Sequence, residues 1–99
     1  MNSFSVNVLS YITYVSVWVI DSRLRGIYRA MQNHYYDKAD YLIRDILDVI
    51  YNAAEVDIES IMLHTIMCNL HMALVELELK RYEQAHNIIR DLHYYVSYE

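Results

Sequence analysis

The chain has 99 residues, of which 56% are hydrophobic, so it is long enough to form one domain with its own core. It contains no proline and a single glycine, which disfavours turn-rich β-sandwiches and barrels and predicts an all-α fold. A net charge of −5 repels phosphate groups, and we therefore expect neither nucleic acid nor an anionic membrane as its partner.

The first segment, residues 3–20, is expected to form a docked helix, because apolar residues recur there at helical spacing: Phe4, Val8, Ile12, Val15 and Val19. Residues 13–19 also alternate like a β-strand, but an otherwise helical chain offers a lone strand no pairing partner. The absence of charge before Asp21 also fits a membrane span, although the many serine and asparagine residues disfavour it. No cleavage pattern of a secretory signal is present.

Three further helices are expected. The helical period predicts one from Tyr36 to Ala53, a second from an N-cap at Asp57 towards Lys80, and a third from Tyr82 to Val96. The middle helix is apolar over so wide an arc that we expect it to pack on two faces, through Ile58, Ile61, Met62, Ile66, Met67, Leu70, Ala73, Leu74 and Leu77.

An internal repeat relates the second and fourth helices. Residues 36–46 align with residues 82–92 at an offset of 46, with five identities and three conservative matches in eleven positions. The repeat predicts four to five antiparallel helices arranged as two related helical hairpins. We expect one domain over residues 1–99, with repeat units at approximately 22–53 and 57–96.

The repeat resembles the tetratricopeptide repeat family. The likeness rests on Leu70, Ala73 and Leu77, on the run Arg81-Tyr82-Glu83-Gln84-Ala85, and on Ile89. The glycine before the tyrosine and the closing proline of that family are absent, and its period is shorter. The resemblance implies degenerate helical hairpins and a role in binding other proteins.

Candidate chemistry is sparse. His64, Cys68 and His71 share one helical face, but three ligands on a core helix favour packing over zinc, so we expect no metal and no cofactor. Arg29 with His34, and Arg81 with His86, resemble the R-x4-H motif of the HEPN ribonucleases, a short pattern that an acidic chain suits poorly. The common catalytic signatures are absent, and we do not expect an enzyme.

Acidic residues and tyrosines form the candidate binding surface. Between residues 37 and 59 lie seven carboxylates against two basic residues, and several project opposite the apolar face. The simplest interpretation is an ordinary solvated face. The eleven tyrosines favour an interface instead, since their rings give large contact area. The expected partner-binding residues are Asp37, Asp40, Tyr41, Asp45, Asp48, Tyr51, Glu55, Tyr94 and Tyr95.

Three functional hypotheses follow. The first is an immunity or antitoxin-type protein that masks a basic toxin, plausibly a nuclease of contact-dependent inhibition. The second is a helical-repeat chaperone, like those of type III secretion, that holds an amphipathic helix of a secretion subunit. The third is self-association, including a homodimer, through exposed aromatic residues. The lone cysteine excludes an internal disulfide and fits a cytoplasmic location.

Overall fold

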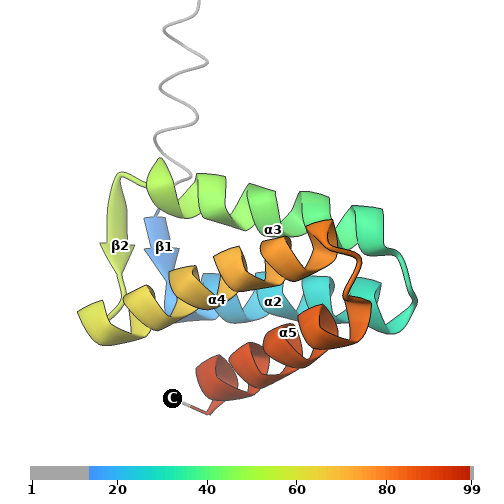
Figure 1. The fold of residues 1–99 in the computed structure, drawn as a ribbon. Helices are drawn as coiled ribbons and strands as arrows, with labels where there is room; N and C mark the ends of the chain where they lie inside the picture. The colour runs from blue at the N-terminus through green and yellow to red at the C-terminus, as the bar shows by residue number, and fades with distance from the viewer. Residues whose placement is uncertain (1–13, 99) are drawn as a thin grey trace, which may run out of the picture.

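Four helices form the body of the protein, as the sequence predicted, and the all-α fold class is thereby confirmed. The structure is a computed structural model, and it describes residues 14–98. Figure 1 shows the helices running alongside one another with a short pair of strands at one end. The helices are α2 (Val17–Gln32), α3 (Tyr36–Tyr51), α4 (Ser60–Glu78) and α5 (Tyr82–Ser97).

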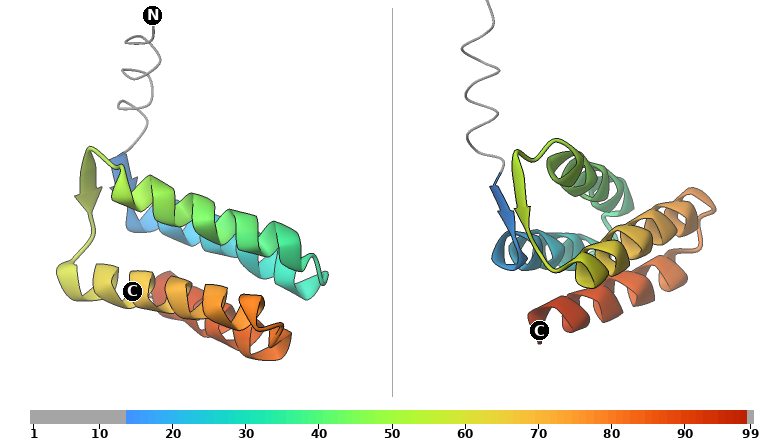
Figure 2. Two further views of the ribbon diagram at one scale, coloured as in Figure 1. Left: turned by 45° about the horizontal axis from the view of Figure 1, so that its top comes forward. Right: turned by 90° about the vertical axis from the view of Figure 1, so that its left-hand side faces the viewer.

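The helices pack as two antiparallel hairpins, α2 with α3 and α4 with α5, which lie against each other (Figure 2). α2 also packs extensively on α5, whereas α3 and α4 contact each other less. The four helices therefore close a ring, as in a four-helix bundle. The resemblance to the tetratricopeptide repeat family stays a prediction.

Both hairpin turns have the same geometry, 46 residues apart. His34 and Lys80 adopt the left-handed conformation, with φ of 62° and 60°. Each turn then closes through the same two backbone bonds, for example Lys80 N–H to Leu77 O at 3.0 Å and Arg81 N–H to Glu76 O at 2.8 Å. This is the Schellman motif, which usually places glycine at the left-handed position. Tight turns form here without glycine.

The core consists of one buried apolar stripe from each helix, and the stripes of the two hairpins correspond at the same 46-residue offset. Leu24 and Leu70 are fully buried at equivalent points of α2 and α4, and so are Ile43 and Ile89 on α3 and α5. Within residues 14–98 no polar or charged residue is buried. The duplication seen in residues 36–46 thus extends over both hairpins.

The predicted first helix is wrong over residues 14–16 and is confirmed from Val17 onwards. Residues Tyr14–Ser16 form a strand, β1, and the helix begins only at Val17. β1 pairs in parallel with β2 (Glu55–Asp57), and Val15 lies opposite Val56. The partner strand comes from the connection between the hairpins, which the sequence pattern did not reveal. The remainder of the predicted segment, residues 3–13, lies outside the described residues.

The start of α4 also differs from the prediction. Asp57 belongs to β2, and the N-cap is Glu59, whose side chain accepts a hydrogen bond from the Met62 N–H at 3.2 Å. Two-sided packing of α4 is also wrong for Ile61, which is 71% exposed. Only one stripe of α4 is fully buried, and it consists of Met62, Ile66, Leu70, Ala73 and Leu77.

Candidate partner-binding surface

The outer side of α3 carries five of the nine predicted binding residues. Asp37, Tyr41, Asp48 and Tyr51 recur at steps of four, seven and three residues and are exposed, with half-buried Asp40 beside them. The two tyrosines are 66% and 61% exposed. They stand outward because the opposite side of α3, around Ile43 and Ile50, fills the core. We call Asp37, Tyr41, Asp48 and Tyr51 the α3 face.

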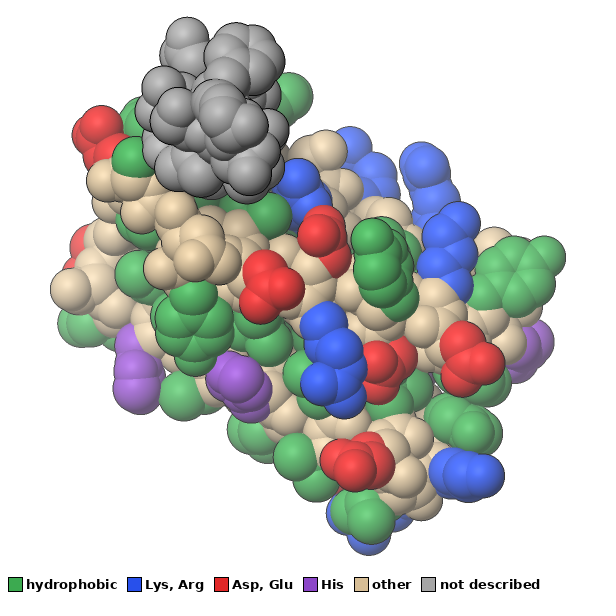
Figure 3. Space-filling view, turned by 90° about the horizontal axis from the view of Figure 1, so that it is seen from above, with side chains coloured by type: hydrophobic (Ala, Val, Ile, Leu, Met, Phe, Trp, Pro, Cys, Tyr) green, Lys and Arg blue, Asp and Glu red, His purple; other side chains and the backbone are tan. Residues whose placement is uncertain are grey.

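Ion pairs reduce the charge near the α3 face. Asp40 accepts a hydrogen bond from Arg44 at 2.7 Å, and this bond raises the pKa of the Arg44 guanidinium above its usual value. Asp45 turns towards α2 and pairs with Arg23 at 2.6 Å. Figure 3 accordingly shows acidic and basic side chains interspersed when the molecule is seen from above. Within residues 14–98, Asp37 and Asp48 form no ion pair.

The remaining predicted residues lie elsewhere. Glu55 is exposed on β2. Tyr94 is exposed on α5, where its ring lies 4.6 Å from that of Tyr98. Tyr95, also on α5, is half-buried against the core. α5 packs mainly on α2 and α4 and meets α3 at the stacked rings of Tyr36 and Tyr82, so Tyr94 and Tyr95, further along α5, do not join the α3 face.

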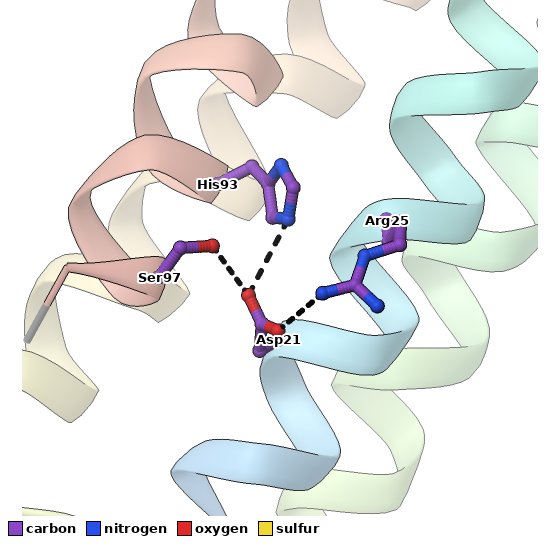
Figure 4. A network of polar contacts seen from close by, with 4 residues as sticks. All are labelled: Asp21, Arg25, His93 and Ser97. Atoms are coloured by element: carbon purple, nitrogen blue, oxygen red, sulfur yellow. Dashed lines mark hydrogen bonds and ion pairs between the residues drawn. The ribbon is translucent and has the colours of Figure 1, made fainter.

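A polar network joins α2 to α5 (Figure 4). Asp21 accepts hydrogen bonds from Ser97 Oγ at 2.5 Å and Arg25 at 2.8 Å. His93 Nε2 lies 3.3 Å from the same carboxylate, within ion-pair distance but without hydrogen-bond geometry. Serine, histidine and aspartate meet here, yet the aspartate and not the histidine holds the serine hydroxyl. That order differs from a Ser-His-Asp triad, in which the histidine lies between the other two, and the network ties the two hairpins together.

Two shallow pockets involve tyrosines. One, of about 280 Å³, is lined by Tyr28, Arg90, His93, Tyr94, Ser97 and Tyr98. The other, of about 550 Å³, surrounds Tyr36 and Tyr82, whose rings stack at 4.0 Å. The stack was not anticipated, although both tyrosines open their units of the sequence repeat.

The predicted zinc candidates do not converge. His64 Nε2 lies 3.5 Å from Cys68 Sγ, but His71 Nε2 turns to the Tyr51 hydroxyl at 3.1 Å. No group of three potential ligands occurs in the part of the chain that the structure describes. In the R-x4-H pairs each histidine has another neighbour: His86 packs beside Tyr28 while Arg81 binds Glu76, and His34 Nδ1 lies 2.7 Å from the Tyr36 hydroxyl.

An apolar surface on α4 was missed by sequence reasoning. Ile61, Met72, Val75 and Leu79 are all more than half exposed. Of the described helices, α4 is long and apolar enough to cross a membrane by length and composition, with a mean hydropathy of 1.3, a test that core helices also pass. The wide apolar arc of α4 in the sequence already indicated this surface. Such an arc shows that a face is apolar, but it does not show whether another part of the chain covers that face.

Comparison of the chain with protein-family models, curated proteins and solved structures found no match.

Proposed function

We propose that the protein is a non-catalytic inhibitor that binds a cationic protein partner through the α3 face, in the manner of an immunity or antitoxin protein. The observation that carries the proposal is that Asp37 and Asp48, which flank the exposed ring of Tyr41, form no ion pair with any residue that the structure describes. The net charge of −5 supports it, because an acidic protein attracts a basic one over a long range.

The partner would be a basic toxin, plausibly a nuclease, whose cationic active site is masked by the α3 face. Carboxylates on an exposed rim accelerate encounter more than they strengthen the final complex. A buried tyrosine ring, in contrast, gives large contact area at low entropic cost and slows dissociation. The same proposal places the protein in the cytoplasm and requires no cofactor.

The test uses the product of the adjacent gene as the candidate partner. Asp37→Asn with Asp48→Asn should slow association about 3- to 10-fold at low salt and leave it nearly unchanged at high salt. Stopped-flow mixing at two ionic strengths measures this. A matched control is Glu83→Gln with Asp91→Asn, which makes the same charge change on α5 and also removes one first-turn carboxylate.

Tyr41→Ala provides the second arm. Tyr41→Ala should increase the dissociation rate about 10-fold or more, because a tyrosine buried in an interface often contributes about 2 kcal/mol or more to the binding free energy. Equal association rates for the aspartate variants and the wild type at both salts would contradict the proposal.

A second candidate function is favoured by the apolar surface of α4. A chaperone that holds an amphipathic helix of a secretion subunit needs such a surface, and its complex would depend little on salt. Association that is insensitive to ionic strength but lost in Val75→Glu would support this alternative.

A further inference from the structure

The exposed side of α4 carries a regular apolar stripe. It runs over Ile61, Thr65, Cys68, Met72, Val75 and Leu79, at successive steps of four, three, four, three and four residues. That is the heptad spacing by which one helix packs along another. The four large aliphatic side chains of this α4 stripe are 71%, 53%, 51% and 54% exposed, and no member of it is charged.

The fold does not require this stripe. α2 occupies the equivalent place in the first hairpin. The residues 46 positions earlier are Val15, which is buried in β1, and then Val19, Ser22, Gly26, Arg29 and Asn33. Arg29 thus stands where α4 has Val75, and Gly26 where it has Met72. Since α2 and α4 bury equivalent stripes in the same core, only α4 keeps an apolar outer side. Figures 1 and 2 show no described segment over that side.

We propose that a second copy of the chain covers the α4 stripe, forming a two-fold symmetric dimer with antiparallel α4 helices. The stripe is symmetric about position 70, so that an antiparallel copy pairs Ile61 with Leu79 and Cys68 with Met72 across the interface, with Thr65 opposite Val75 between them. Every residue of the stripe then has a stripe residue of the second copy opposite it, from one end of the helix to the other.

Charge and dipoles favour the antiparallel direction. Opposed helices align their dipoles favourably, and His64 on the flank of one stripe lies beside Glu78 of the second copy at both ends. An uncharged stripe offers nothing to the basic partner proposed for α3. The dimer does not use Asp37, Tyr41 or Asp48 of the α3 face. Only Tyr51 comes near it, since its hydroxyl lies 3.1 Å from Nε2 of His71, the residue before Met72.

The interface is small. Eighteen residues of helix span about 27 Å, and a single pair of helices falls at the low end of specific interface sizes. We therefore expect a weak dimer, with a dissociation constant on the order of 10 μM, and the experiment must cover concentrations on both sides of it.

Sedimentation of the full chain from about 1 to 500 μM tests the proposal, a range set by that expected affinity. The wild type should pass from monomer to dimer, and Val75→Glu should stay monomeric over the same range. The matched control is Arg29→Glu at the equivalent position of α2, which should dimerise like the wild type. Ile61→Lys is the second disrupting variant, and circular dichroism checks that each variant is folded. A wild type that is monomeric throughout overturns the proposal.

Disulfide formation tests the direction of the helices. Met72→Cys should form a covalent dimer under mild oxidation, because its new thiol faces Cys68 of the second copy. The wild type should not form a covalent dimer through Cys68. In an antiparallel pair the two Cys68 residues are offset by about 6 Å along the helix axis. Together with the distance between the helices, this offset places the two sulfur atoms too far apart for a disulfide. Efficient cross-linking of the wild type, or none in Met72→Cys, would contradict the antiparallel dimer. The variants Asp37→Asn and Asp48→Asn should dimerise normally, which separates this test from that of the proposed function.

Discussion

Two alanines determine how closely the helices of each hairpin approach. Ala39 and Ala85 are 46 residues apart and completely buried in the first turns of α3 and α5. Packing at such positions leaves no room for a larger side chain without a shift of the backbone. The sequence repeat identified both positions, because a small residue conserved between two aligned units indicates a close contact.

Replacing either alanine by leucine should therefore destabilise the protein by about 1–3 kcal/mol. Urea unfolding of Ala39→Leu and Ala85→Leu measures the change. Gln84→Leu is the control, since Gln84 is exposed one position before Ala85 and should change stability by less than about 0.5 kcal/mol. An overpacked alanine variant as stable as the control would show that the helices do not approach closely there.

Between helices, the turn from α4 to α5 contains an ion pair that depends on pH. Arg81 donates a hydrogen bond to Glu76, and this bond lowers the pKa of the carboxyl group. A carboxylate with a lowered pKa in the folded state stabilises the fold above its unfolded pKa, about 4.3, and loses this contribution as the pH falls through the lowered value.

Glu76→Gln should consequently be less stable than the wild type at pH 7, and the difference should shrink as the pH falls below about 4. Urea unfolding at a series of pH values records it. Glu78→Gln is the control, because Glu78 is exposed and forms no ion pair within the described residues. All unfolding is measured at about 1 μM protein, where the proposed dimer is dissociated. A difference from the wild type that is constant over all pH values would assign the effect to packing rather than charge.

Elements with a strong local pattern were predicted well, and those that depend on distant partners were not. α3 and α5 begin at the predicted residues, Tyr36 and Tyr82, because each buries one regular stripe. The strands β1 and β2 have three residues each, and their stability comes from pairing across 41 positions. Residues 13–19 showed a strand pattern, but no local signal identified residues 55–57 as the partner strand, and Asp57 was consequently interpreted as a helix cap.

The binding surface was predicted in part for the same reason. Periodicity places Asp37, Tyr41 and Asp48 on one side of a single helix, and the structure agrees. It cannot say that Asp45 faces Arg23 across the α2–α3 contact, or that Tyr94 lies on a helix that packs mainly on α2 and α4. Those facts depend on the order of helices around the bundle, which only tertiary packing decides.

In the whole molecule, α2 and α5 are held more firmly than α3 and α4. α2 and α5 pack extensively on each other, and each also packs on its hairpin partner. α3 and α4 each have one extensive neighbour and share a smaller contact. Both proposed binding surfaces therefore lie on the two helices with fewer contacts. This arrangement is common, because binding elements are often found in the weakly packed parts of a fold, which open locally most easily.

Hydrogen exchange should reveal this order. We expect the slowest backbone amides in α2 and α5, exchanging only on global unfolding, and faster exchange in α3 and α4 through partial opening. Raising the protein concentration should slow exchange in α4 but not in α3, because only α4 is buried in the proposed dimer. In Val75→Glu the exchange of α4 should not depend on concentration. Equal protection of all four helices would mean that the bundle opens as one cooperative unit, with no difference in stability between its two pairs of helices.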